Sequence, residues 1–297
     1  MSHNSSVRLG AIYAFTAYLI WGIAPIYFRA IDQVAASDIL CHRIIWSCVL
    51  LVLLSGFTRN GPQIQQILRR PRQLLILLIT ALLIGCNWLI FIWAVNHHHI
   101  LDTSLGYFIT PLVNVVMGIL FLRERLRTLQ WLAVILALAG VLVELIEFGA
   151  IPWIASALAL SFSSYGLLRK QIQIAALPGL LIETVWLLPL ALIYLIFWDH
   201  SGSPELFTAH PTLTLLVICA GIVTTVPLLF FTGAATRLPL STLGFFQYLA
   251  PSLTFILAIT LYQEPLAPER LLTFGFIWVA LLVFIFENRR HARISAH

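Results

Sequence analysis

Two ionisable side chains lie where they could do chemistry. Arg43 and Glu183 each lie about five residues inside an otherwise apolar stretch, and charged groups in such stretches are rare and usually face a partner or a cavity. We interpret Glu183 either as a proton-coupling or gating residue, or as one end of a structural hydrogen bond. We interpret Arg43 either as a gating residue, or as a long side chain that reaches the nearby membrane interface.

The depths of these two residues predict that they do not form an ion pair with each other. At 1.5 Å per residue, each lies roughly 7 Å inside an apolar core about 30 Å thick, and they enter it from opposite sides. Roughly 15 Å then separates their levels, so each must find a different partner.

A run of three histidines, His97 to His99, lies at the end of an apolar stretch. Consecutive residues of a helix point in different directions, so three adjacent imidazoles chelate a metal poorly, and no carboxylate cluster completes a site. We therefore predict no metal centre and expect solvated or hydrogen-bonded imidazoles. A role of His97 in sensing external pH is the alternative, because an unperturbed imidazole titrates at about pH 6.5.

Two further stretches carry polar faces at helical spacing. The faces comprise Tyr107, Thr110, Pro111 and Asn114 in one stretch, and Gln247, Pro251 and Thr254 in the other. A proline inside a helix frees a backbone carbonyl, which together with amide side chains makes a hydrogen-bonding wall for a substrate. The alternative is that the two amides tie neighbouring helices together, as polar groups commonly do in bilayers.

Aromatic and polar residues elsewhere complete the set of predicted cavity residues. They are Trp21, Asn87, Trp88, Tyr165 and Thr225. An amide, hydroxyls and large rings suit a ligand that has a flat apolar body and a few polar groups. For any single tryptophan, anchoring at the membrane interface or helix packing is the alternative.

The elements that carry these residues are predicted to be membrane-spanning helices. Of 297 residues, 60% are hydrophobic and only 10% are charged, whereas soluble domains carry about 25% charged residues. Because lipid cannot satisfy an exposed backbone, each apolar run of about twenty residues is predicted to be a helix. Ten spans are expected, at roughly 9–28, 39–57, 73–95, 104–122, 129–147, 151–168, 178–197, 212–232, 241–262 and 271–287.

The charges between the spans predict their direction. With both termini in the cytoplasm of a bacterium, the inner segments hold fourteen of the basic residues, Arg169 and Lys170 among them, and only Arg29, Arg43 and Arg270 remain for the other side. This asymmetry is typical of multi-pass proteins in the inner membrane.

An internal repeat divides the chain into two predicted units, 7–148 and 149–290. The sequence TSLGYF at 103–108 is matched by STLGFF at 241–246, and Pro111 recurs 140 residues later as Pro251. At the same offset Arg43 aligns with Glu183. Because each unit has five spans, the second must enter the membrane in the opposite direction, an inverted repeat that is frequent among secondary transporters.

The sequence carries none of the phosphate-binding or hydrolase motifs of soluble enzymes, and its polar loops are too short for a nucleotide-binding domain. We therefore expect no enzyme activity and no cofactor. Membrane lipids and a small-molecule substrate are the expected partners, without nucleic acid, and the chain is expected to act as a monomer or homodimer.

Several segments resemble the RarD proteins, which belong to the EamA group of the drug/metabolite transporter superfamily. They are NWLIFIWAVN at 87–96, SLGYFI at 104–109, IETVWLLP at 182–189 and GFFQY at 244–248. The resemblance covers nearly the whole chain. It implies an all-helical permease of two inverted five-helix repeats, with a central cavity between them.

The function expected from the repeat and from the resemblance is secondary transport, with export of small metabolites or drug-like solutes by alternating access, and with coupling to protons. A non-transporting membrane protein, such as a lipid-handling enzyme or an assembly partner, is the alternative. A channel is less well supported, because no filter segment is present.

Overall fold

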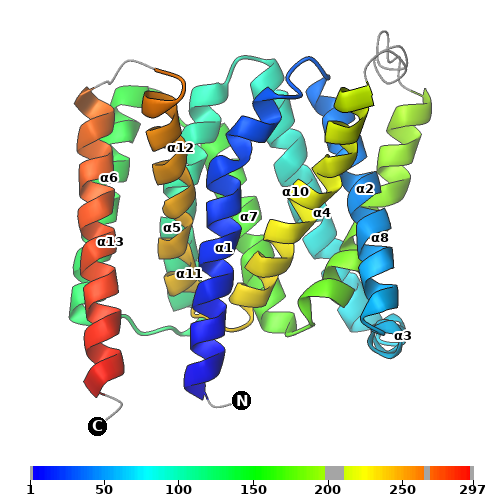
Figure 1. Cartoon of the computed structure of the whole chain (residues 1–297). Helices are drawn as coiled ribbons and strands as arrows, with labels where there is room; N and C mark the ends of the chain where they lie inside the picture. The colour runs from blue at the N-terminus through cyan, green and yellow to red at the C-terminus, as the bar shows by residue number, and fades with distance from the viewer. Residues whose placement is uncertain (1–2, 198–210, 264–267, 295–297) are drawn as a thin grey trace.

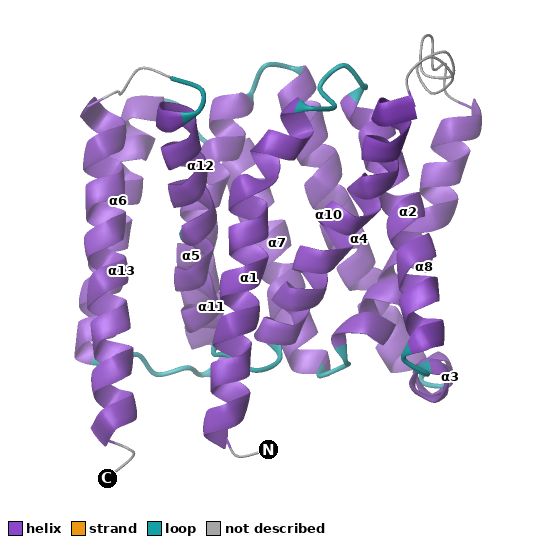
Figure 2. Cartoon of the chain, viewed as in Figure 1, coloured by secondary structure: helices purple, strands orange, loops and turns teal. Residues whose placement is uncertain are grey.

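We analysed a computed structural model, which describes residues 3–197, 211–263 and 268–294. Every regular element in these ranges is a helix (Figure 2). The first part of the chain forms α1 (His3–Arg29), α2 (Ala36–Phe57), α3 (Gly61–Leu68), α4 (Pro71–Asn96), α5 (Ile100–Leu122) and α6 (Thr128–Phe148). The second part forms α7 (Trp153–Ile172), α8 (Ala176–Phe197), α10 (Pro211–Ala235), α11 (Leu240–Gln247), α12 (Leu249–Thr260) and α13 (Pro268–Ile294).

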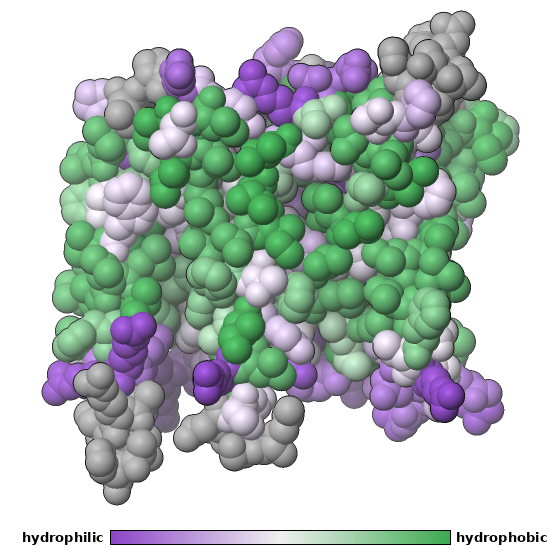
Figure 3. Space-filling view, viewed as in Figure 1, coloured by the Kyte–Doolittle hydropathy of each residue, from purple (hydrophilic) through white to green (hydrophobic). Residues whose placement is uncertain are grey.

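Nine helical segments of the described chain are long and apolar enough to cross a membrane, with α11 and α12 counted as one. Figure 3 shows the corresponding hydrophobic belt between two hydrophilic ends. The prediction of an all-helical, multi-span membrane protein is confirmed. Helix α7 falls outside the nine because its serines and the basic pair Arg169 and Lys170 lower its hydropathy, so the tenth crossing remains a prediction.

The helices match the expected spans to within a few residues, with two additions. A short helix, α3, occupies the predicted loop at 58–72. The ninth span is interrupted at Tyr248, between α11 and α12. Pro251 has no N–H to donate to the carbonyl of Gln247. At the interruption the Tyr248 amide donates to the Phe245 carbonyl, three residues earlier, at 3.3 Å. Pro111, by contrast, lies within the continuous helix α5.

Both ends of the described chain lie on the same side of the bundle (Figure 1). We call this side the termini face; it also carries the loops at 58–60, 123–127, 173–175 and 236–239. The opposite side, the far face, carries the loops at 30–35, 97–99 and 149–152. The basic loop residues, including Arg59, Arg123 and Arg125, gather on the termini face, as the predicted topology requires.

The helix contacts follow a pattern that the predicted repeat would produce. Helix α2 packs against α8 and α10, and α4 packs against α8 and α7; α1 packs against α10 and α12, and α7 against α4 and α5; α6 packs against α13. The predicted repeat makes α7 the counterpart of α1, α8 of α2, α10 of α4, α11 and α12 of α5, and α13 of α6. When each helix is exchanged for its counterpart, every contact named above becomes itself or another of the contacts named above.

The contact between α2 and α10 depends on Gly221. A Cβ atom at this position would lie 2.5 Å from the carbonyl carbon of Trp46. The approach also allows the Ser47 hydroxyl to donate a hydrogen bond to the Gly221 carbonyl at 3.3 Å. Close backbone approach at small residues is how helices in bilayers gain packing and hydrogen bonds.

We predict that Gly221→Ala destabilises the protein. The added methyl group must push α2 away from α10, and overpacking of this kind costs about 1–3 kcal/mol. Thermal unfolding of purified protein in detergent measures the effect as a lower midpoint temperature. Gly275→Ala is the matched control, because a Cβ atom there meets nothing within 4 Å. Equal midpoints for the two variants would contradict the prediction.

Candidate functional site

A buried ion pair lies between helices α7 and α8. Nη1 of Arg169 is 3.5 Å from Oε1 of Glu183, and both side chains are at most 1% exposed. The hydroxyl of Thr80, on α4, donates to Oε1 of Glu183 at 2.6 Å, and the hydroxyl of Tyr165 donates to Oε2 at 3.2 Å. Both carboxylate oxygens of Glu183 are therefore engaged by groups from α4 and α7.

The position of Arg169 corrects one prediction. The sequence predicts that Arg169 is among the charges of an inner loop, but this side chain is fully buried. The reason is local: α7 continues to Ile172, and a Cβ atom at position 179 would lie 2.0 Å from Nη1 of Arg169. Only glycine at 179 leaves room for the guanidinium beside α8, so α8 covers a charge that the sequence alone places in a loop.

Arg43 makes a different set of contacts nearer the far face. Its Nε donates to the hydroxyl of Thr224, on α10, at 2.7 Å. The central guanidinium carbon lies 5.0 Å from the ring centre of Trp88 and 5.6 Å from that of Phe28, within the range of cation–π attraction. Arg43 thus contacts α1, α4 and α10 from α2. As expected from their depths, Arg43 and Glu183 have separate partners.

The hydrogen bonds of Arg43 and Glu183 are related to each other by the exchange of helices that relates the two predicted repeats. Arg43 is the eighth residue of α2, and Glu183 is the eighth residue of α8. Arg43 bonds to a threonine on α10, and Glu183 bonds to a threonine on α4. Exchanging α2 with α8 and α4 with α10 converts one bond into the other. One bond therefore lies toward each face of the bundle.

Between these bonds lies a cavity of about 10 Å³, close to the room that one water molecule needs. Trp88, Thr184, Thr224 and Thr225 line it together with aliphatic side chains. The Thr225 hydroxyl is fully buried and has no hydrogen-bond partner. Predicted cavity residues Trp88 and Thr225 are thus brought together, in a conformation that leaves almost no empty space.

Trp21 and Tyr165 belong to an aromatic cluster next to the ion pair. The Trp21 ring lies 5.9 Å from Phe162 and 5.8 Å from Phe231, measured between ring centres. Tyr165 stacks on Phe231 at 6.0 Å. The cluster joins α1, α7 and α10, so these two predicted cavity residues pack between the halves, with the Tyr165 hydroxyl reaching Glu183.

The two polar faces predicted from the sequence contact each other. Nδ2 of Asn114, on α5, donates to Oε1 of Gln247 at 2.9 Å, beside the interruption between α11 and α12. Thr110 donates to the carbonyl of Gly106 in its own helix, and Thr254 donates to the carbonyl of Gly22 at 3.3 Å. In this conformation Asn114 and Gln247 tie α5 to α11. This agrees with the interpretation that the two amides hold neighbouring helices together, and not with a wall open to a substrate.

Asn87 and Tyr107 lie apart from the small cavity. Nδ2 of Asn87 donates to the Leu158 carbonyl and to the Ser161 hydroxyl, which ties α4 to α7. Tyr107 is 48% exposed and lies beside Phe91. Tyr107 also lies near enough to Arg43 for the two to interact electrostatically, whereas the Asn87 amide is already hydrogen-bonded.

His97 lies at the far face, outside the bundle interior. Its ring stacks on Trp93 with 4.6 Å between ring centres, and Nδ1 is 2.8 Å from the Trp93 carbonyl. The adjacent His98 has a left-handed backbone, with φ of 63°, and Nδ1 of His99 is 3.3 Å from a carboxylate oxygen of Asp102. The three imidazoles therefore have separate surroundings.

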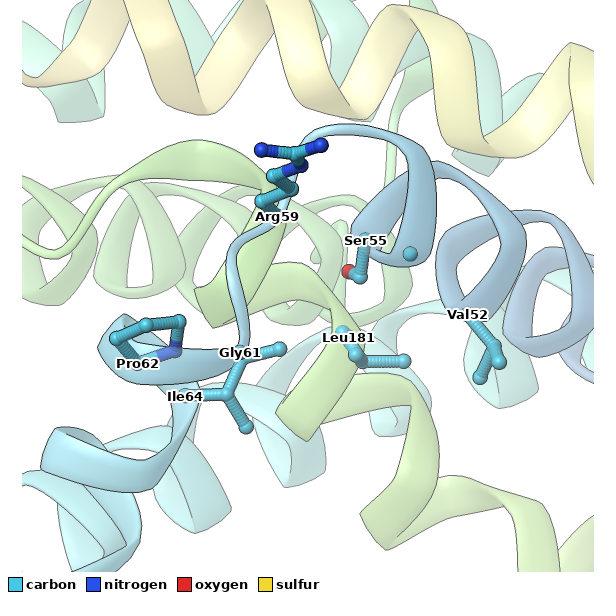
Figure 4. Close-up of a pocket in the computed structure, with 8 residues that line it drawn as sticks. Val52, Ser55, Arg59, Gly61, Pro62, Ile64 and Leu181 are labelled. Atoms are coloured by element: carbon cyan, nitrogen blue, oxygen red, sulfur yellow. The ribbon is translucent and has the colours of Figure 1, made fainter.

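A larger hollow, of about 470 Å³, lies at the turn between α2 and α3 on the termini face. Figure 4 shows its lining, with Ser55 and Arg59 on one side and Gly61 and Pro62, at the start of α3, on another. None of the predicted site residues lines it. The sequence does not reveal this hollow, because it depends on α3, whose eight residues look like part of a polar loop.

We predict that Glu183→Gln lowers stability and that Arg169→Met restores it in the double variant. Removing one partner of a buried ion pair leaves an uncompensated charge, at a cost of about 3–5 kcal/mol, whereas replacing both partners by uncharged groups is often neutral. Unfolding midpoints of the two single variants and the double variant in detergent measure this coupling. A Glu183→Gln protein as stable as the original would contradict it.

Comparisons with known proteins agree with this architecture. A family model described as the EamA-like transporter family matches residues 8–146. "Protein RarD" of Escherichia coli is 54% identical over 94% of this chain and 95% of its own length. An "Uncharacterized transporter" of Vibrio cholerae is 53% identical over 95% of this chain and 93% of its own length.

A crystal structure of a protein with 18% sequence identity has the same fold, with a TM-score of 0.73 over 92% of this chain and 96% of that one. Two of the relatives are named as uncharacterized transporters, and nine helical segments of the described chain are of membrane-spanning length and composition. The chain therefore belongs to the RarD subfamily of the EamA-like transporters, multi-pass membrane proteins of the bacterial inner membrane.

Proposed function

We propose that this protein is a secondary transporter that exports small metabolites or drug-like solutes by alternating access. The observation that carries the proposal is the matched pair of hydrogen bonds, Arg43 to Thr224 and Thr80 to Glu183. Each bond joins one predicted repeat, 7–148, to the other, 149–290. Export, rather than uptake, is part of this proposal.

The two bonds act as gates at opposite ends of one pathway. Arg43 and Glu183 each lie seven residues, about 10 Å, from the start of their helices, and these helices start at opposite faces. Opening the contact between α2 and α10 admits solutes from the far face, and opening the contact between α4 and α8 admits them from the termini face. The cavity of about 10 Å³ between them corresponds to a state with both gates closed.

Glu183 is the group proposed to couple this movement to protons. Protonation of its carboxylate removes the charge that faces Arg169 and weakens the bond from Thr80. The termini face is assigned to the cytoplasm, because the basic loop residues gather there and such residues are retained on the cytoplasmic side. Proton binding at Glu183 would then open the cytoplasmic gate.

We expect disulfide bonds across either gate to stop transport. The pairs are Arg43→Cys with Thr224→Cys and Thr80→Cys with Glu183→Cys, in a background where Cys41, Cys48, Cys86 and Cys219 are replaced by serine or alanine. Transported solutes are first identified by comparing metabolites released from cells lacking and cells overproducing the protein. Each pair should lose more than about 90% of this release under oxidation.

Reduction should restore release wherever the uncrosslinked double variant is active. Single-cysteine variants under the same oxidant are the matched controls, because they lack the crosslink. Full release with either gate crosslinked would overturn alternating access through this interface. No protein-dependent change in any metabolite, in cells or in proteoliposomes, would favour the non-transporting alternative.

Proton coupling has a separate test. In proteoliposomes that take up an identified solute, Glu183→Gln combined with Arg169→Met should make the rate insensitive to an imposed pH gradient, because the neutral amide neither binds nor releases a proton. The Arg169→Met protein alone keeps the carboxylate and should still respond to the gradient. An unchanged response of the double variant would exclude Glu183 as the coupling residue.

A further inference from the structure

Arg43 has more hydrogen-bonding capacity than the protein uses. A guanidinium carries five N–H donors, and within the described ranges only Nε of Arg43 has an acceptor, the Thr224 hydroxyl at 2.7 Å. No carboxylate of the described residues forms an ion pair with it, whereas Arg127 and Arg169 each have one. Its two terminal nitrogens, Nη1 and Nη2, have no acceptor among the described residues.

Such an arrangement is unusual inside a membrane protein. A cation in the apolar core is costly, and it commonly pairs with a carboxylate or lines a pathway for substrates. The faces of Trp88 and Phe28 attract the guanidinium, but they offer no acceptor for the four remaining N–H groups. Two parallel N–H groups of a guanidinium match the two oxygens of a carboxylate.

The surroundings of Arg43 indicate what the rest of the ligand is like. Trp88 and Thr224, which contact Arg43, also line the small cavity, together with Thr225 and aliphatic side chains such as Leu187 and Leu228. The Thr225 hydroxyl is fully buried and has no partner. A ligand that reaches from Arg43 into this cavity meets an aromatic face, an aliphatic wall and a hydroxyl that is available to it.

The same surroundings disfavour a positively charged group on the ligand. No carboxylate of the described residues lines this cavity, and Glu183, the neighbour of the lining residue Thr184, already has partners at both oxygens. An ammonium group on the ligand would therefore lack a counter-charge, and a simple anion fits better than a zwitterion.

We propose that Arg43 binds the carboxylate of the transported solute, and that this solute is a monocarboxylate anion with a compact apolar or aromatic body. The inference rests on the proposed transport function and names its class of substrate. Binding uses Nη1 and Nη2, so the bond from Nε to Thr224 can stay in place while the carboxylate is held. The body of the ligand then occupies the space beside Trp88 and Thr225 that opens as the helices separate.

Phenylacetate is the probe, tested on the purified full-length protein in detergent by equilibrium dialysis. Phenylacetamide and phenethylamine have the same ring but carry a neutral and a positive group, and phenylalanine adds an ammonium group to a related carboxylate. We expect saturable binding of phenylacetate, weaker binding of phenylalanine, and no saturable binding of the neutral and cationic compounds.

Substitutions at position 43 identify the residue responsible. Arg43→Gln should weaken phenylacetate binding by about 30-fold or more, the usual effect of removing one partner of a buried charged pair. Arg43→Lys keeps the charge without the paired N–H groups and should give an intermediate affinity. Arg59→Gln is the matched control, because it removes an exposed arginine of the termini face and should leave binding unchanged. If Arg43→Gln does not fold, Arg43→Lys and Trp88→Leu provide the comparison.

The outcomes separate this inference from the transport proposal. Equal binding of phenylacetate and phenylacetamide, unchanged binding in the folded Arg43 variants, or no binding of phenylacetate would overturn the inference. Protein-dependent flux of another solute that excess phenylacetate does not inhibit would overturn it while leaving transport intact. Arg43-dependent phenylacetate binding without flux of any solute in proteoliposomes would support the anion site and overturn the transport proposal.

Discussion

A polar group inside the bilayer must find its partner within the protein, because lipid offers none. This constraint explains the contacts at the centre of the bundle. Glu183 meets it fully, with Arg169, Thr80 and Tyr165 around its two oxygens. Arg43 meets it only in part, with one hydroxyl and two aromatic faces. Arg169 faces Glu183 at 3.5 Å, but its three nitrogens have no hydrogen-bond partner among the described residues.

One hydrogen-bond partner of each group comes from the opposite half of the molecule. Arg43 and Thr224 are 181 residues apart, and Thr80 and Glu183 are 103 residues apart. Other hydrogen bonds also cross this interface, among them those from Ser47 to the Gly221 carbonyl and from Tyr27 to the Leu216 carbonyl.

The tie between Asn114 and Gln247 places a second polar contact beside a weak point of the backbone. Helix α11 ends at Gln247, where Pro251 removes a backbone hydrogen bond, and α12 begins two residues later. Pro111 sits opposite in α5 without interrupting it. The two polar faces are similar in sequence, yet only one of them accompanies a break, so the halves differ in backbone regularity at this position.

Most of the fold follows from local properties of the sequence. Hydropathy over about twenty residues locates the helices, since each span must satisfy its own backbone, and the repeated segments predict which helices are counterparts. Hydropathy does not predict the short helix α3 or the interruption at Tyr248. The first lies in a polar segment, and the second depends on how a single proline is accommodated.

The sequence alone determined that Arg43 and Glu183 lie deep in apolar helices and at different levels, because depth is a matter of position along a helix. It could not determine their partners, since these lie on helices distant in the chain. Only the tertiary structure decided that Arg169 turns inward beside Gly179 to meet Glu183, and that Asn114 and Gln247 bond to each other. Side-chain pairing across an interface depends on which helix faces pack together, and on where glycine leaves room for them to approach.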